Sequence, residues 1–185
     1  MIDQSLTYFV ERMGKMPVIV YVALLVVFLI GSVTLLLVYG TKKGLSILSG
    51  LVLFEYLVLL VCSTLVFRPS NEIHRYSLEF LWSYAAIRNG ETGLLKIIIM
   101  NVLMFVPIGV LLSLLFKNYK LWSIILIGFC ISISIELMQL LFKKGFAELD
   151  DIFHNTIGCI IGCVIYRLTN ELYRCLTNRK LVNEL

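Results

Sequence analysis

Five long apolar stretches, separated by short polar segments, dominate the pattern along the chain. A helix needs about 20 mostly apolar residues to cross the hydrocarbon core of a bilayer, and each stretch reaches that length once a few embedded polar residues are allowed. The pattern therefore predicts an all-α integral membrane protein, a single bundle of about five transmembrane helices that forms one domain over residues 1–185. The predicted helices cover residues 17–39, 44–67, 94–116, 121–142 and 151–173.

The composition supports this interpretation. Of the 185 residues, 59% are hydrophobic and 15% are charged, so the chain is far more apolar than an ordinary soluble domain. The sequence contains no phosphate-cradling glycine loop, no Cys/His zinc spacing, no nucleophile elbow and no heptad repeat. We therefore expect neither nucleotide hydrolysis, zinc chemistry nor coiled-coil assembly, and no nucleic-acid partner.

Lysine and arginine gather on one side of the predicted bundle, as they do on the cytoplasmic side of membrane proteins. The other side holds the N-terminal segment and the connections at residues 68–93 and 143–150, where acids offset the sparser basic residues. The pattern predicts a multi-pass protein of the cell membrane with its N-terminus outside and its C-terminus in the cytoplasm. The basic side comprises Lys42, Lys43, Lys117, Lys120, Arg174, Arg179 and Lys180.

Three polar residues within the apolar stretches are predicted to lie at one depth. At a rise of about 1.5 Å per residue, Asn101 lies about 10 Å from the outer end of its helix, Glu136 about 9 Å and Asn155 about 6 Å. The agreement holds whichever way the molecule faces, because the three helix ends would move together. The last three helices are therefore predicted to share a polar layer.

Helical spacing predicts which side chains share a face, because residues three or four positions apart lie above one another. The last two helices each carry a stripe of polar or small residues, and their short connection predicts antiparallel neighbours whose stripes meet. Glycines four residues apart permit close approach of two helix backbones. The stripes are Asp151, Asn155, Gly158 and Gly162 on the last helix, and Ser132, Glu136, Gln139 and Lys143 on the helix before it.

Glu136 is a carboxylate placed within hydrocarbon, which costs several kcal/mol unless the group is paired, hydrated or protonated. One interpretation is structural: a hydrogen bond to Gln139, Asn155 or Asn101 would lock the bundle. The other is functional: in an outward-facing polar cavity, protonated Glu136 and the more hydrated, ionised Asp151 could divide acid and base roles.

The third predicted helix carries the stretch NVLMFVPIG, residues 101–109. Pro107 has no N–H and clashes with the preceding turn, so it is predicted to bend the helix and to free the carbonyl of Leu103. The bend could widen the bundle near Asn101, or Pro107 and Gly109 could serve packing alone.

The long connection at residues 68–93 combines aromatic side chains with Arg68, Arg75 and Arg88. Aromatic residues suit the headgroup region and guanidinium groups bind phosphate, so this segment could form a lid that recognises a lipid headgroup. The alternative is an ordinary aromatic belt with arginines that extend to the interface.

A histidine and two adjacent acids lie at the mouth of the last helix. Asp150 precedes His154 by four residues, so their side chains could hydrogen-bond, although a lone histidine at an interface is more often a surface residue. The carboxylates of Asp150 and Asp151 could hold a divalent cation together with a lipid phosphate. No other cofactor is predicted.

Three motifs in a fixed order carry a family resemblance: NVLMFVPIG, then ISIELMQLLF, then a basic pair followed by GFAELDDIFHNTIGCIIG. Together they strongly resemble the VanZ-like family of small multi-spanning membrane proteins. The basic pair, Lys143 and Lys144, stands where family members often carry an arginine. The matching residues are Asn101, Pro107, Gly109, Glu136, Gln139, Asp151, Asn155, Gly158 and Gly162.

The resemblance implies lowered sensitivity to teicoplanin-like glycopeptides, acting at the cell envelope. It also implies a remote similarity to membrane enzymes that exchange or hydrolyse phosphate-linked lipid headgroups. The ligand would then be a membrane lipid or a lipid-linked envelope precursor. In that case Glu136 and Asp151 would be acid and base, and the groups that bind substrate would be Asn101, Gln139, Asn155, Asp150, His154 and Arg75 or Arg88.

Two further classes of function stay open. The bundle could bind or shield an envelope lipid without catalysis, in which case substitution of Glu136 by glutamine would be tolerated. A proton-coupled lipid transporter could instead use Glu136 and Glu55 as a proton path, although five short helices show no inverted repeat.

Overall fold

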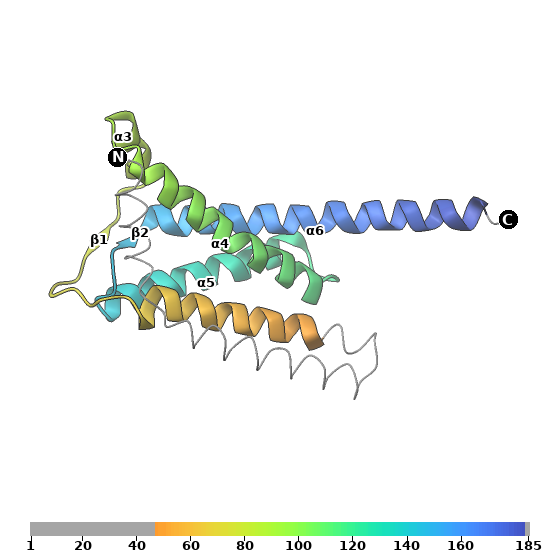
Figure 1. Ribbon diagram of the computed structural model, residues 1–185, viewed down its shortest axis with the longest axis horizontal. Helices are drawn as coiled ribbons and strands as arrows, with labels where there is room; N and C mark the ends of the chain where they lie inside the picture. The colour runs from red at the N-terminus through yellow and green to blue at the C-terminus, as the bar shows by residue number, and fades with distance from the viewer. Residues whose placement is uncertain (1–46, 184–185) are drawn as a thin grey trace.

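The structure, a computed structural model, describes residues 47–183 (Figure 1). Four of its helices are long and apolar enough to cross a membrane: Ile47–Val66, α4 (Gly93–Leu115), α5 (Leu121–Leu141) and most of α6 (Leu149–Asn183). The first of these ends in a π-helical turn, η1 (Cys62–Val66). These helices confirm the all-α membrane protein. The helix predicted at 17–39 and the N-terminal segment lie outside the described residues.

The last three helices begin and end close to the residues that the apolar pattern predicts, except at the C-terminal end of α6. The ends of α4 and α5 lie within one residue of the predicted ranges, 94–116 and 121–142. Helix α6 starts two residues before 151 and continues to Asn183, well beyond 173. No glycine or proline follows Gly162, so the helix continues after the apolar pattern has ended.

Helices α4 and α6 approach most closely at their glycines. A β-carbon added at Gly158 or Gly162 would meet backbone carbonyl oxygens of α4, and one added at Gly109 would meet the backbone of α6. The stripe that ends in Gly158 and Gly162 was predicted to face the preceding helix, α5, and for the two glycines this prediction is wrong. Gly162 lies against Gly109 of α4 and Gly158 lies against Val102 of the same helix, whereas Gly128 of α5 lies against the side chain of Cys159.

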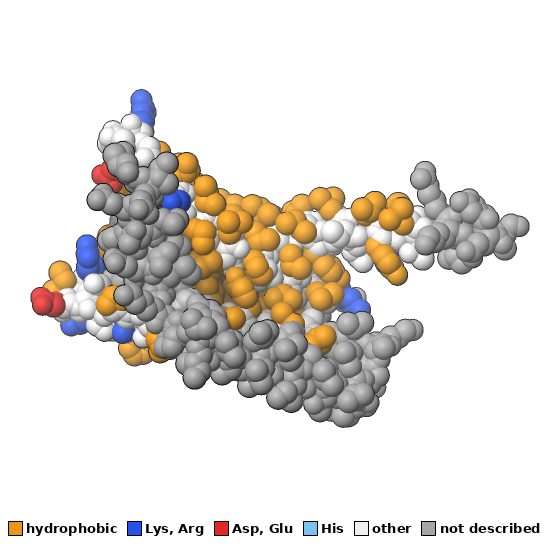
Figure 2. Space-filling view, in the orientation of Figure 1, with side chains coloured by type: hydrophobic (Ala, Val, Ile, Leu, Met, Phe, Trp, Pro, Cys, Tyr) orange, Lys and Arg blue, Asp and Glu red, His pale blue; other side chains and the backbone are white. Residues whose placement is uncertain are grey.

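Helix α5 runs antiparallel to α4 and α6, as its short connection to α6 predicts (Figure 1). Hydrophobic side chains cover the flanks of these helices, where a membrane protein meets hydrocarbon (Figure 2). Between the helices lies a buried core. Its members include Phe105, Ile108, Leu112, Ile124, Ile135, Cys159 and Cys163.

The connecting segment, residues 67–92, is more ordered than the loop that was predicted there. Its strand β1 (Tyr76–Ser77) pairs in parallel with β2 (Ala147–Glu148), and it also forms the short helix α3 (Trp82–Arg88). The ammonium groups of Lys143 and Lys144 donate to backbone carbonyls of this segment at 3.1 and 2.8 Å. These contacts tie the connecting segment to the turn that follows α5.

Pro107 lies within α4, which continues as one helix to Leu115. The bend predicted at this proline, and any widening near Asn101, stay predictions.

Candidate functional site

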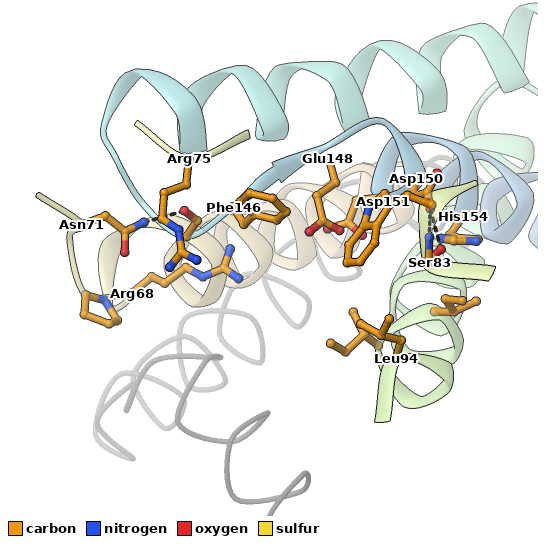
Figure 3. Close-up of a pocket in the computed structure, with 15 residues that line it drawn as sticks. Arg68, Asn71, Arg75, Ser83, Leu94, Phe146, Glu148, Asp150, Asp151 and His154 are labelled. Carbon is orange, nitrogen blue, oxygen red and sulfur yellow. Dashed lines mark hydrogen bonds between the residues drawn. The ribbon is translucent and has the colours of Figure 1, made fainter. Parts of the chain in front are cut away.

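Two adjoining cavities lie at the end of the bundle where α4 and α6 begin and α5 ends. The large cavity has a volume of about 420 Å³ (Figure 3) and the small cavity about 60 Å³. Arg68, Ile97 and Asp151 line both, so these side chains form the boundary between the two spaces. The connecting segment supplies one wall of the large cavity, whereas helices supply nearly all of the small one.

The small cavity brings together the polar layer that depth predicted. It is lined by Asn101 of α4, Glu136 and Gln139 of α5, and Asp151 and Asn155 of α6. The amide of Asn101 donates to a carboxylate oxygen of Asp151. These five residues, which come from three helices, therefore line one space, although their roles stay predictions.

Glu136 is 5% exposed, and one of its carboxylate oxygens accepts the backbone N–H of Glu148 at 3.1 Å. Among the described residues, the backbone of Glu148 is the hydrogen-bond partner of Glu136. The structural interpretation predicted a bond to Gln139, Asn155 or Asn101 instead. The donor comes from β2, which begins the turn into α6. The carboxylate thus ties α5 to the backbone of β2 rather than to a neighbouring side chain.

Two amide oxygens in the small cavity have no hydrogen-bond partner among the described residues, those of Gln139 and Asn155. The amide nitrogen of Asn155 donates to the hydroxyl of Ser132 at 2.9 Å. Buried polar atoms are usually paired, so the small cavity retains unused hydrogen-bonding capacity.

Asp150 anchors the connecting segment. Its side chain is 1% exposed, and its two oxygens accept the backbone N–H groups of Leu81 and Ser83 and the hydroxyl of Ser83. Leu81 has a φ of 61°, a left-handed conformation that leucine rarely adopts, and this anchor stabilises it. Asp150 was predicted to bind substrate and to hydrogen-bond His154. Its oxygens instead hold the start of α3, although the residue also lines the large cavity.

His154 is buried, with 1% of its surface exposed, so the alternative interpretation of a surface histidine is wrong. Its Nε2 atom lies 3.0 Å from the hydroxyl of Tyr84, and its ring packs at an angle against Phe153. His154 also lines the large cavity.

The three arginines of the connecting segment differ in position. The guanidinium of Arg68 lies against Gly145, where a β-carbon would collide with it, and that of Arg75 lies 5.7 Å from the centre of the Phe146 ring. Both arginines line the large cavity. Arg88 is exposed at the last residue of α3 and is not among the lining residues, so its predicted contact with phosphate is not supported by its position.

The sequence alone does not indicate several of the lining residues: Asn71, Trp82, Ser83, Phe146, Glu148 and Arg68, which the sequence marks only as one of three arginines in the connection. Two local signals were available. Arg68 stands directly before Pro69 at the end of an apolar stretch, and Glu148 is the first acid before the last helix.

The described residues hold no group of three or more His, Cys, Asp or Glu side chains that could bind a metal ion. The oxygens of Asp150 already accept donors from Leu81 and Ser83. The divalent cation considered for Asp150 and Asp151 stays a prediction. The large cavity is lined by two guanidinium groups, those of Arg68 and Arg75, and by three carboxylates, those of Glu148, Asp150 and Asp151.

The family model described as VanZ/LLP1 matches residues 18–170. Protein VanZ of Enterococcus faecium is 31% identical over 80 residues, which cover 43% of this chain and 50% of that protein. The match thus spans about half the length of this curated relative. No solved structure matches the chain.

Proposed function

The chain belongs to the VanZ/LLP1 family, and on that premise we propose that it lowers sensitivity to teicoplanin-type glycopeptides at the cell envelope by binding a phosphate-linked envelope lipid. The observation that carries this proposal is the large cavity, which two guanidinium groups line at the end of the membrane-spanning helices. The planar guanidinium of arginine can donate two parallel hydrogen bonds to a phosphate. Leu94, Ile97 and Ile98 of α4 supply an apolar wall that suits the acyl part of a lipid.

The end that carries the cavities is proposed to face the outside of the cell membrane. Lys117 and Lys120 lie at the opposite end, in the connection between α4 and α5, and basic connections favour the cytoplasm. We expect a green fluorescent protein fused to the C-terminus to fluoresce and an alkaline phosphatase fused there to be inactive. An active phosphatase and a dark fluorescent protein would reverse the orientation.

A second candidate function is chemistry on the phosphate ester. It is favoured by Asp151 lining both cavities while Glu136 lies in the small one. In hydrolysis, Asp151 would accept a proton from a water molecule while the oxygen of that water forms a bond to phosphorus. Protonated Glu136 would give a proton to the alcohol oxygen as the phosphorus–oxygen ester bond breaks.

The test is teicoplanin susceptibility of a sensitive host that expresses each variant at a matched membrane level. We expect Arg75→Gln to lose most of the protection, because loss of a charge-assisted phosphate contact weakens binding roughly tenfold or more. Arg88→Gln is the matched control, since this arginine lies outside the cavity, and it should protect as the wild type does. Full protection by Arg75→Gln would contradict the proposal.

Two further variants, with envelope lipids profiled alongside, separate binding from chemistry. If Glu136→Gln and Asp151→Asn lose protection, together with a lipid species that changes only in the wild type, the site acts on its ligand. If both variants protect fully, the acid–base mechanism is wrong and lipid binding or shielding is the function.

A further inference from the structure

The two ends of the large cavity differ in chemistry. Figure 3 shows Arg68 and Arg75 at one end and His154 at the other. The proposed function assigns the arginine end to phosphate. The cavity, at about 420 Å³, extends beyond that end, so a ligand larger than a phosphate group has room to reach toward the histidine end.

Two buried ring nitrogens of the lining side chains have no hydrogen-bond partner among the described residues. They are Nδ1 of His154, a residue that is 1% exposed, and Nε1 of Trp82. Both residues line the large cavity. A buried donor or acceptor without a partner is costly, and in a native protein it is most simply explained by a ligand or ordered water that pairs with it.

Both rings are held in place by other contacts. The hydroxyl of Tyr84 lies 3.0 Å from the second ring nitrogen of His154, and the ring of Trp82 meets that of Phe146 edge to face with centres 6.5 Å apart. Asp150 fixes the backbone of Ser83, the residue next to Trp82. The two atoms are therefore oriented before any ligand binds, which lowers the entropy cost of recognition.

The chemistry of the two atoms selects the ligand group. An indole N–H can only donate, whereas Nδ1 of histidine donates or accepts according to its tautomer. A hydroxyl group can accept from both atoms when Nδ1 carries the proton, or accept from the indole and donate to Nδ1 when it does not, so it suits both tautomers. A phosphate alone would fill the arginine end and leave these atoms unpaired.

We propose that His154 and Trp82 form a subsite for a hydroxyl group, and that the lipid recognised here carries a hydroxyl-bearing phosphodiester headgroup, such as a glycerol or sugar phosphate. This inference rests on the proposed function, because Arg68 and Arg75 hold the phosphate of the same headgroup. It adds a specificity that phosphate binding does not supply.

The test compares two lipids that differ in hydroxyl groups but not in charge. Purified full-length protein in detergent is titrated with dioleoyl phosphatidylglycerol or dioleoyl phosphatidylpropanol, and the bound fraction is measured by native mass spectrometry. We expect the wild type to bind phosphatidylglycerol about tenfold more tightly, as one or two good hydrogen bonds allow. Trp82→Phe and His154→Phe should lose this preference and keep their affinity for phosphatidylpropanol.

Arg75→Gln distinguishes the two proposals, because it should weaken binding of both lipids equally. Equal affinity of the wild type for the two lipids would overturn the hydroxyl subsite while a weakened Arg75→Gln still supports phosphate binding. A preference that survives in both ring variants would also overturn it. If Arg75→Gln binds both lipids as the wild type does, the phosphate site itself is wrong.

Two controls complete the design. Trp82→Phe keeps an aromatic ring and carries the test alone if His154→Phe fails to fold, as judged by thermal melting. Soluble glycerol 3-phosphate is added as a competitor: no displacement at equimolar concentration supports a lipid ligand, and full displacement would overturn the lipid part of the inference.

Discussion

Replacing Gly158 with alanine will lower the free energy of unfolding by about 3 kcal/mol, the upper part of the range for overpacking a close interface. The added β-carbon would collide with a backbone carbonyl of Val102 in α4, and backbone cannot move aside as a flexible side chain can. Alanine favours helix over glycine by up to about 1 kcal/mol, which offsets only part of this cost. Thermal melting in detergent should show a fall in Tm of roughly 5–10 °C.

Gly50→Ala is the matched control for this experiment. It is also a glycine within a membrane-spanning helix, but a β-carbon there would lie 3.7 Å from a side-chain methyl of Leu115, an ordinary van der Waals contact. Its Tm should stay unchanged or rise slightly. Equal melting of the Gly158→Ala and Gly50→Ala proteins would show that α4 and α6 do not meet through their glycines.

The second large effect is expected at Asp150. In Asp150→Asn the charge is lost, and the new amide N–H₂ faces donors where an oxygen accepted them, so the contacts to Leu81 and Ser83 weaken together. We expect local opening of α3 to become about 2 kcal/mol easier, which corresponds to a roughly 30-fold larger open population. Trypsin cleavage after the exposed Arg88 should accelerate by a similar factor when the open form is short-lived.

Glu79→Gln serves as the control, because Glu79 is an exposed acid of the same segment and its substitution changes the net charge equally. Its cleavage rate should match the wild type. A wild-type rate in Asp150→Asn would mean that another contact, such as the pairing of β1 with β2, holds the segment in place.

The sequence predicts those features of this protein that depend on local pattern. The positions of the helices follow from the lengths of the apolar stretches, because a helix that crosses hydrocarbon must be apolar along the whole span. The meeting of Asn101, Glu136 and Asn155 follows from depth, because the rise per residue is nearly constant in every helix. Both inferences need no knowledge of which helices are neighbours.

Features that depend on a choice of partner were missed or wrongly predicted. Periodicity places Gly158 and Gly162 on one stripe but does not say that Gly109 lies opposite. The contact of Asp150 with Ser83 joins residues 67 positions apart, and neither side chain has a local feature that names the other. Arg68 likewise meets Gly145 only because the connecting segment folds back over the start of α6.

Helix α6 is longer than the apolar part of a membrane is thick. Its 35 residues make a rod about 52 Å long, whereas the hydrocarbon core is only about 30 Å thick. Figure 1 shows the rod continuing past the end of α4 and the start of α5, and there it carries Glu171 and Arg174, whose side chains pair at 3.7 Å. With its first residues at one boundary of that core, α6 would reach about 20 Å beyond the other boundary, past the layer of lipid headgroups.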